Sequence, residues 1–358
     1  MKLESESQRE DESRPLTPPV RVDCYVTDRC NLSCGFCYYK DASRRFLSSG
    51  QGDLSGEEWC RFFEELERLQ VLQVGLCGGE PLLHADIRRM FDFFAGSRMQ
   101  FLLYSNGTTV MEEIAKRLAA TRRCGYVQIS IDGAERAHDR IRGVGVWRKA
   151  VRAVELLCQE GVPVHVNMVL TDETAEGMVE TARMLVEKYP IERIRVNPVE
   201  GDATVSMPAF LRVLRELLPL AEQYPAQFPK IGVLRKWRQV CHPKGVDDGY
   251  GCYNQLRKRC AVRSDGSITS CFSNDRDCYG HINRDDFLEA WRREDWQRFR
   301  ESTRCEGILP TGEKCANCRY RGECRPFCPL NKAQWDTEGG ANLCLREIAE
   351  GMRDLLPS

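Results

Sequence analysis

The hydrophobic and polar positions follow two alternating periods between residues 21 and 224. Six short apolar runs rich in β-branched and aromatic residues predict strands, at residues 21–28, 71–77, 100–105, 126–131, 162–170 and 191–198. Each run is followed by a pattern with the period of an amphipathic helix, at residues 55–69, 85–95, 111–120, 146–159, 174–189 and 207–224. Six β/α units in succession predict a parallel sheet with helices outside it.

The composition changes at both ends of this alternation. Residues 1–20, rich in Glu, Ser, Arg and then Pro, predict a disordered tail, which leaves residues 21–225 for the α/β domain. Residues 226–358 are rich in Cys and Gly, with short strand signals around a turn at residues 261–272 and a helix at the C-terminal end. Because this last segment has too few apolar residues for a large core, we expect bound metal to stabilise it.

The charge balance argues against bulk electrostatic binding to nucleic acid or to an anionic membrane. The chain has 52 Lys and Arg against 53 Asp and Glu, a formal net charge of −1. No segment approaches the roughly 20 apolar residues of a membrane span, and the first residues are too charged for a signal peptide. We therefore expect a cytoplasmic protein with no nucleic acid and no membrane among its partners.

The 19 cysteines are unevenly placed along the chain. In a reducing compartment stable disulfides are uncommon, and clustered thiols more often bind metal or take part in redox chemistry. The first cluster, "CNLSCGFC", places Cys30, Cys34 and Cys37 on one loop directly after the first predicted strand. Four thiolates close a structural zinc site or hold all four irons of a cubane cluster, whereas three leave one metal position open for a reacting molecule. A zinc site completed by a distant residue and a pure electron-transfer cluster are the alternatives for the triplet alone.

Polar or Gly-rich strings also follow the next predicted strands. They are Gly78–Pro81 ("GGEP"), Ser105–Gly107 ("SNG") and Ser130–Gly133 ("SIDG"), after the second, third and fourth strands. In parallel sheets and barrels the functional side chains collect at the C-terminal ends of the strands, so we expect all these strings on one face of the domain. Within the first string, Glu80 is an isolated carboxylate that can accept hydrogen bonds from an ammonium group of a ligand.

Taken together and in this order, the four strings resemble the motifs of the radical S-adenosylmethionine (SAM) superfamily. The resemblance covers roughly residues 21–201 and implies a partial (β/α)6 barrel. It also implies that the cysteine triplet holds a [4Fe–4S] cluster, whose fourth iron is chelated by the amino and carboxylate groups of SAM. Reductive cleavage of SAM would give a 5'-deoxyadenosyl radical, which removes hydrogen from a C–H bond of the substrate.

The same resemblance assigns the residues that contact SAM. Gly78, Gly79 and Glu80 would belong to the cofactor site, the last two at the amino group of SAM. For Arg142 a surface ion pair is the alternative role, although a guanidinium can hold a carboxylate in bidentate geometry. The remaining contacts would be Phe36 with the adenine, Ser105 and Asn106 with the ribose or the methionine part, and Ser130 and Arg142 with the carboxylate or the ribose.

A second group of cysteines lies in the last third of the chain. The string "CANCRYRGECRPFC" has the spacing C-x2-C-x5-C-x3-C, Cys344 follows it, and Cys252 and a Gly-x4-Cys string ending at Cys271 precede it. This seven-cysteine pattern resembles the SPASM extension of a subset of radical SAM enzymes, which implies two auxiliary [4Fe–4S] clusters and three clusters in all. One auxiliary cluster would be held by Cys315, Cys318, Cys324 and Cys344.

The other auxiliary cluster would use Cys252, Cys271 and Cys328, in the interleaved manner that ferredoxin spacing also shows. Cys260 is the expected fourth ligand of this cluster. The alternatives are Cys241, Cys278 and Cys305, or a position left open for the substrate. A zinc ribbon is the competing interpretation of the C-x2-C spacing, but the cysteines exceed the number that two zinc sites would need.

The resemblance leaves the substrate open. SPASM relatives act mostly on peptides and proteins, so we expect oxidative modification of a ribosomally made peptide, with a low-potential electron donor such as flavodoxin or ferredoxin. Phe272 follows Cys271 where sulfatase-maturing relatives have Asp, which argues against that branch. With about 20 residues before the first predicted strand, we expect no N-terminal peptide-recognition domain of the kind that many crosslinking relatives carry. This weakens the peptide hypothesis without removing it, because other members manage without that domain.

Two other functions compete with peptide modification. The first is dehydrogenation or epimerisation of a small metabolite, of the aminocyclitol, sugar or haem-precursor type. The sequence identifies no catalytic residue, but a spare thiol such as Cys278 could donate a hydrogen atom in an epimerase. The second is an iron–sulfur electron carrier that never cleaves SAM.

Overall fold

The computed structural model of the chain describes residues 17–37, 39, 52–199, 205–228, 259–271, 277–302 and 350–352. Its described strands form one nine-stranded sheet in the order β6-β5-β4-β3-β2-β1-β7-β8-β9. Neighbouring strands from β6 through β1 to β7 pair in parallel, and the last two pairs are antiparallel. The strands are β1 (Arg21–Thr27), β2 (Gln73–Gly78), β3 (Gln100–Ser105), β4 (Cys124–Ser130), β5 (Val164–Leu170), β6 (Arg193–Pro198), β7 (Arg259–Val262), β8 (Ser267–Thr269) and β9 (Gly280–His281).

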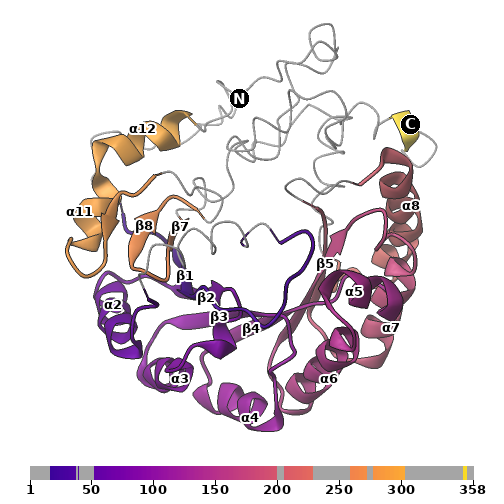
Figure 1. Cartoon of the computed structure of the whole chain (residues 1–358), viewed down its shortest axis with the longest axis horizontal. Helices are drawn as coiled ribbons and strands as arrows, with labels where there is room; N and C mark the ends of the chain where they lie inside the picture. The colour runs from indigo at the N-terminus through magenta and orange to yellow at the C-terminus, as the bar shows by residue number, and fades with distance from the viewer. Residues whose placement is uncertain are drawn as a thin grey trace, which may run out of the picture.

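The sheet curves into an open arc, with the long helices on its outer side (Figure 1). This confirms the predicted partial (β/α)6 barrel, and each predicted strand and helix is present with small shifts at its ends. The long helices are α2 (Gly56–Arg68), α3 (Ile87–Gly96), α4 (Glu112–Thr121), α6 (Val146–Gln159), α7 (Met178–Lys188) and α8 (Met207–Gln223).

Four shorter helical elements were not expected from the sequence. They are short and bury few residues, so they carry no long apolar stripe that a periodicity argument could detect. In α5, for example, His138 is the buried residue. These elements are η1 (Pro81–Leu83), α5 (Glu135–Arg142), α11 (Phe287–Arg292) and α12 (Glu294–Ser302).

Local sequence explains why the first long helix begins where it does. Ser55 caps α2 by accepting a hydrogen bond from the backbone N–H of Glu58, and the Glu58 carboxylate accepts one from the backbone N–H of Ser55. The buried face of α2 carries Trp59 and Phe63, whose rings stack with centroids 5.9 Å apart. Burial of such aromatic side chains stabilises the packing of the helix on the sheet by about 2 to 3 kcal/mol for each ring.

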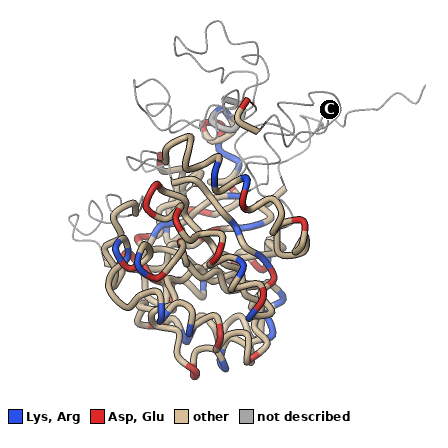
Figure 2. Tube along the Cα trace, turned by 90° about the vertical axis from the view of Figure 1, so that its right-hand side faces the viewer, with Lys and Arg blue, Asp and Glu red and all other residues tan. Residues whose placement is uncertain are grey.

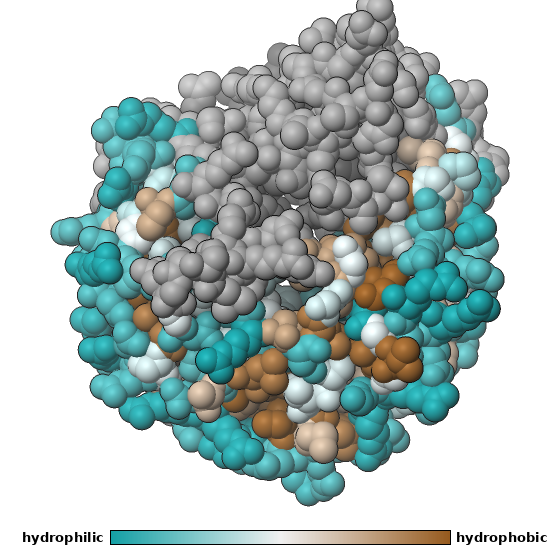
Figure 3. Space-filling model, in the orientation of Figure 1, coloured by the Kyte–Doolittle hydropathy of each residue, from teal (hydrophilic) through white to brown (hydrophobic). Residues whose placement is uncertain are grey.

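The two faces of the sheet differ in chemistry because successive side chains of a strand point to opposite sides. On β2, Val74 and Leu76 belong to the core under the helices, whereas Cys77 packs with Tyr25 in a separate small cluster on the inner face. The outer surface of the helices is hydrophilic, with hydrophobic residues inside that ring (Figure 3). Lysines and arginines alternate with acidic residues over the described surface (Figure 2), in keeping with the near-zero net charge.

The C-terminal segment continues the barrel sheet in a way that was not predicted. Strand β7 pairs in parallel with β1, Val22 lying opposite Cys260, and β8 and β9 follow at the edge. The boundary predicted at residue 226 lies within the described part of the chain, but it stays a prediction, as does the tail at residues 1–20, of which only 17–20 are described. None of the helices in the described ranges combines the length and apolar composition that crossing a bilayer would require.

Candidate active site

The three cysteines of the first motif lie on a single loop that follows β1. Cys30 and Cys37 are exposed, Cys34 is buried, and the backbone N–H of Cys37 donates a hydrogen bond to the carbonyl oxygen of Cys34 at 3.2 Å. Burial raises the pKa of the Cys30 thiol, and the carboxylate of Glu80 and the other two cysteines raise it further. The triplet is therefore a compact group of thiols open to solvent on one side, at the strand end where the sequence predicts it.

The "GGEP" string holds the start of this loop through its backbone. The N–H of Gly79 donates to the carbonyl of Thr27 at 2.8 Å, and the N–H of Glu80 donates to the carbonyl of Arg29 at 2.7 Å. A β-carbon on Gly79 would lie 2.2 Å from the Arg29 carbonyl oxygen, and Gly78 has a φ of +132°, which favours glycine. Both glycines are needed because the end of β2 runs directly against the backbone of the segment before Cys30, Gly78 against Thr27 and Gly79 against Arg29.

Glu80 connects the ends of β2 and β3. Its carboxylate is fully buried and accepts hydrogen bonds from the Ser105 hydroxyl at 2.9 Å, the Asn106 backbone N–H at 2.8 Å and the Leu82 backbone N–H at 3.3 Å. Burial raises the pKa of Glu80 to about 7, and the three hydrogen bonds limit the rise. The Glu80 side chain thus has protein donors around it, while its contact and that of Gly79 with the SAM amino group stay predictions.

Asn106 lies directly beside the cysteine loop. Its side-chain amide donates to the Asn31 side-chain oxygen at 3.0 Å, and the Asn31 amide donates to the Thr108 hydroxyl at 2.8 Å. The backbone N–H of Thr108 closes the ring by donating to the Asn106 side-chain oxygen at 2.9 Å. The structure brings the predicted residues Ser105 and Asn106 together with Glu80 and adds Asn31, which the sequence analysis missed although it lies inside "CNLSC".

Arg142, at the last turn of α5, is fixed between a carboxylate and the cysteine loop. Its guanidinium forms a bidentate pair with Asp132, lies 3.9 Å from the Cys34 sulfur, and stacks over the Phe36 ring at 5.3 Å. Burial raises the pKa of the Cys34 thiol, and the Arg142 charge opposes this rise. The ion pair is internal rather than on the surface, and a contact of Arg142 or Phe36 with SAM stays a prediction.

Asp132, the acidic residue of "SIDG", is a further residue that the sequence analysis missed. It is fully buried, accepts a hydrogen bond from the backbone N–H of Val169 at 3.0 Å, and lies 3.7 Å from the ring of His138. Burial lowers the pKa of His138 to about 4, which keeps this imidazole neutral. A carboxylate ten residues before Arg142 in "SIDGAERAHDRIR" could have suggested the pair, since a buried guanidinium needs an anionic partner.

Ser130 ends β4 on the same inner face of the sheet. Its neighbour in the parallel register is Asn167 on β5, which in turn lies opposite Arg195 on β6. Within the described ranges no residue hydrogen-bonds to the Ser130 hydroxyl. The predicted contact of Ser130 with SAM stays a prediction.

The second group of cysteines is described only in part. Cys260 lies within β7 in the hydrophobic core with 1% of its surface exposed, and Cys271, also buried, follows β8. Cys278 is exposed before the edge strand β9, and its thiol donates to the carbonyl of Gly280 at 3.2 Å. The roles predicted for these three thiols stay predictions. Outside the described residues lie Cys241, Cys252, Phe272, Cys305, Cys315, Cys318, Cys324, Cys328 and Cys344.

The chemistry of the cysteine loop fits an iron–sulfur cluster. Within the described ranges no three His, Cys, Asp or Glu side chains converge on a point as they would around a single ion. In a cubane each thiolate binds its own iron, so the ligands enclose a body and need not converge. Two accessible thiols and a third beside a guanidinium provide such a set, because a neighbouring positive charge favours the thiolate form.

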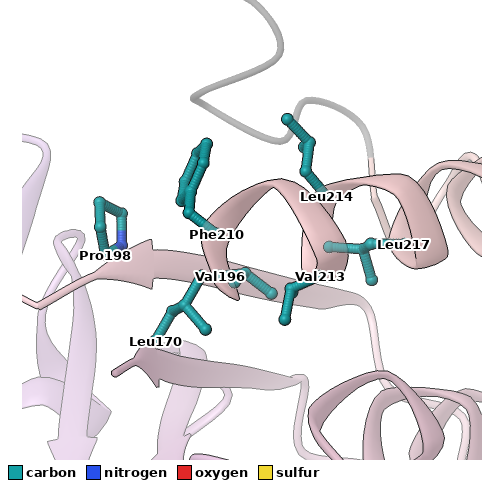
Figure 4. Close-up of a pocket in the computed structure, with 7 residues that line it drawn as sticks. All are labelled: Leu170, Val196, Pro198, Phe210, Val213, Leu214 and Leu217. Carbon is teal, nitrogen blue, oxygen red and sulfur yellow. The ribbon is translucent and has the colours of Figure 1, made fainter. Parts of the chain in front are cut away.

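A small pocket of about 10 Å³ lies on the other side of the sheet, between the ends of β5 and β6 and helix α8 (Figure 4). All of its lining residues are apolar, so it offers no group for chemistry and is a gap in the packing under α8. The lining residues are Leu170, Val196, Pro198, Phe210, Val213, Leu214 and Leu217.

Comparison with known proteins agrees with the fold and the motifs. Residues 24–185 match the model of the radical SAM superfamily, and residues 252–319 match the model of SPASM, an iron–sulfur cluster-binding domain. The mycofactocin maturase MftC of Mycobacterium ulcerans is 27% identical over 337 residues, which cover 88% of this chain and 85% of that protein. An AdoMet-dependent heme synthase of Methanosarcina barkeri is 24% identical over 325 residues, covering 86% of this chain and 90% of the relative.

The solved structures add the fold. SuiB of Streptococcus suis superposes with a TM-score of 0.69 at 16% identity, over 92% of this chain and 78% of that one. Its low identity supports the architecture alone. The two family models together with the order of "CNLSCGFC", "GGEP", "SNG" and "SIDG" on successive strand ends identify the chain as a member of the radical SAM superfamily that carries a C-terminal SPASM domain.

Proposed function

We propose that this radical SAM enzyme oxidatively modifies a ribosomally made peptide by removing hydrogen from one of its C–H bonds. Membership in the superfamily brings SAM and a [4Fe–4S] cluster, which together supply a 5'-deoxyadenosyl radical when bound. The observation that carries the proposal is the braced cysteine loop at the mouth of the barrel, joined to a SPASM domain. The relative MftC is named a maturase, and SuiB has been crystallised with its precursor peptide SuiA.

The residues around the loop would position the cofactor. Cys30, Cys34 and Cys37 would hold three irons, and the backbone of Gly79 and Glu80 would keep the loop at the strand end, as its two hydrogen bonds to the loop indicate. Arg142 would place a positive charge beside Cys34, which favours its thiolate form. The inner face of the sheet would exclude bulk water and orient the target carbon.

The SPASM domain would hold two auxiliary clusters, three in all. Cys315, Cys318, Cys324 and Cys344 would bind one, and Cys252, Cys271 and Cys328 the other, with Cys260 as its fourth ligand or an open position. These clusters would accept the electron that the substrate loses. A flavodoxin or ferredoxin in the cytoplasm would reduce the SAM-binding cluster.

A small haem-type metabolite is the second candidate substrate, because the Methanosarcina barkeri relative is named an AdoMet-dependent heme synthase and aligns with 86% of this chain. A porphyrin-derived substrate would carry several carboxylates and no peptide bond. Incubating the enzyme with peptides and, separately, with a haem precursor therefore distinguishes the two functions.

The test uses anaerobically reconstituted full-length protein with SAM and dithionite. We expect about twelve irons per chain, formation of 5'-deoxyadenosine, and a mass change in a short peptide encoded next to the gene. Cys34→Ala should lose about four irons and all 5'-deoxyadenosine, whereas Cys158→Ala on the outer helix α6 should behave as wild type. Absence of 5'-deoxyadenosine from reactions of the wild type would refute the enzymatic function. Modification of a haem precursor but of no peptide would refute the proposal that the substrate is a peptide.

A further inference from the structure

A row of buried polar atoms that have no partner among the described residues crosses the inner face of strands β4, β5 and β6. In the parallel register Gln128 lies opposite His165, and His165 lies opposite Arg193. Within the described part of the chain, the Oε1 atom of Gln128, the Nδ1 atom of His165 and the Nε atom of Arg193 are buried and make no hydrogen bond. Because nearly all buried polar atoms in proteins are paired, three neighbours in one row indicate a ligand that completes them.

The alternation of side chains places this row on the inner side of the barrel. On β4 and β5, Val127, Ile129, Val164 and Val166 are core residues under the helices, so the residues between them face inward. His165 is 5% exposed and its ring stacks on Tyr126 with centroids 3.8 Å apart. The row therefore faces the inner side of the barrel, and on β4 it lies two residues before Ser130, the strand-end residue of the "SIDG" motif.

The lower end of this interior is closed by a satisfied network. The Arg21 guanidinium is paired with Asp23 and bonded to the Tyr104 hydroxyl, and the hydroxyls of Tyr104 and Tyr126 lie 2.9 Å apart. Tyr126 in turn carries the stacked ring of His165. The groups of this network already have partners, whereas the row of Gln128, His165 and Arg193 next to it does not among the described residues. We therefore take the network as the floor of a site.

The wall above this floor is positively charged. Arg193 and Arg195 both lie on the inner face of β6, two residues apart and thus roughly 7 Å along the strand. Neither guanidinium has an ion pair or hydrogen bond with any other residue in the described ranges. Burial lowers the pKa of His165 to about 4, and the two arginines contribute to the decrease, so the imidazole is neutral.

The hydrogen-bonding character of His165 follows from its other nitrogen. Nε2 lies 3.4 Å from a carboxylate oxygen of Glu192, and in the neutral tautomer that carries its proton on Nε2 the Nδ1 atom is an acceptor. The Oε1 atom of Gln128 is an acceptor as well. The wall thus combines two guanidinium groups with two acceptors, none of which has a hydrogen-bond partner among the residues that the structure describes.

We propose that this wall binds a carboxylate of the substrate, with Arg193 and Arg195 as its ligands and with Gln128 and His165 accepting a hydrogen bond from an adjacent N–H or O–H group. This specificity rests on the proposed function, since it assigns a substrate feature within the same barrel. A peptide offers such a pair at its C-terminus, where the carboxylate follows an amide N–H, and at an acidic side chain. A guanidinium binds a carboxylate in bidentate geometry, and two of them select a charged group over a neutral amide.

The test measures binding without turnover, using N-acetylglycine as the probe and its uncharged analogue N-acetylglycinamide as the control. With reconstituted holoenzyme and SAM, we expect N-acetylglycine to bind with a Kd of about 1 to 10 mM by ligand-observed NMR. The amide should bind at least about tenfold more weakly, because it cannot form the ionic contacts. Arg195→Gln and Arg193→Gln should each weaken N-acetylglycine by at least about tenfold, and Arg195→Lys by less.

Two further measurements test whether the effect is specific to the wall and whether the bound carboxylate belongs to the substrate or to SAM. Arg152→Gln, on the outer face of α6, is the matched control and should leave probe binding unchanged. The affinity for SAM should change less than about twofold in the Arg193 and Arg195 variants. A loss of SAM affinity with unchanged probe binding would mean that the wall holds the SAM carboxylate and would overturn the proposal.

Equal binding of the acid and the amide, or no probe binding up to about 50 mM, would also overturn it. Formation of 5'-deoxyadenosine in the same samples distinguishes this failure from failure of the proposed enzymatic function. If SAM is cleaved but the probe does not bind, only the carboxylate wall is wrong. If the Arg193 variant fails to fold, Arg195→Gln still decides the outcome.

Discussion

The two halves of the barrel interior treat their polar groups differently. At the ends of β1 to β3, Glu80, Ser105 and Asn106 are hydrogen-bonded to one another and to the cysteine loop. On β4 to β6, Gln128, His165 and Arg193 bury polar atoms that no described residue satisfies. The first half is preorganised by its own hydrogen bonds around the cysteine loop, whereas the second has buried polar atoms that the proposed ligand would complete.

The largest expected effect comes from breaking the support in the first half. Gly79→Ala would place a β-carbon 2.2 Å from the Arg29 carbonyl oxygen, so β2 and the loop must separate and lose the hydrogen bond between Glu80 and Arg29. We expect a loss of roughly 3 to 4 kcal/mol in the free energy of unfolding, together with loss of SAM cleavage. Urea unfolding and 5'-deoxyadenosine formation measure the two effects.

Gly96→Ala is the matched control for this substitution. Gly96 ends α3, and a β-carbon there would meet nothing within 4 Å. Alanine should be neutral or stabilise by up to about 0.5 to 1 kcal/mol, because glycine is the poorer helix former. Equal losses in the free energy of unfolding of the two variants would show that the close approach of Gly79 to the loop does not contribute to stability.

The second prediction uses the opposite pKa shifts of the two halves. Glu80 has a pKa raised to about 7, so between about pH 4.5 and 7 the folded chain holds a proton that the unfolded chain has released, and stability falls as pH rises. His165 has a pKa lowered to about 4, so between about pH 4 and 6.5 the unfolded chain holds the extra proton, and stability rises with pH. The two dependences have opposite signs.

Substitution of each residue separates the two pH dependences of stability. Relative to wild type, the free energy of unfolding of Glu80→Gln should rise by up to about 3 kcal/mol as the pH increases from about 4.5 to 7. As the pH increases from about 4 to 6.5, the free energy of unfolding of His165→Gln should fall relative to wild type by up to about 2 kcal/mol. The figure is smaller than for Glu80 because the His165 ring is less completely buried, so solvent screens its charge. Urea unfolding of the cluster-free protein at about pH 5 and about pH 7 measures both. Parallel profiles for the two variants would contradict the contrast between the halves.

The smallest expected effect tests the unsatisfied row directly. Gln128→Met replaces a side chain whose buried oxygen has no partner in the described ranges with an apolar one of similar length, so it should be neutral or stabilise by up to about 1 kcal/mol. Ser105→Ala removes a satisfied donor to Glu80 and should cost about 1 kcal/mol. The difference between these two free energies of unfolding is the measurement. A larger loss for Gln128→Met would mean that this row is already complete in the free protein.

Much of the cofactor half could be predicted from the sequence because its elements are local. The strand run at residues 21–28 and the triplet that follows are adjacent in sequence, and "GGEP" follows the next strand, so parallel β/α order alone brings them to one edge. The partner of Arg142 was missed, since Asp132 is ten residues away and only the fold of α5 brings the two together. The pairing of β7 with β1 was missed too, because four residues far along the chain carry no signal for their neighbour.

The sequence by itself determined the β/α alternation, the strand-end motifs and the spacing of the cysteines, because periodicity, glycine and cysteine spacing act over a few residues. Tertiary structure alone decided which inward-facing side chains share a row, because register between strands depends on how the whole sheet closes. Gln128, His165 and Arg193 are unremarkable in the sequence, separated by 37 and 28 residues. That they share a row, and that their buried polar atoms find no partner among the described residues, becomes visible only once β4, β5 and β6 lie side by side.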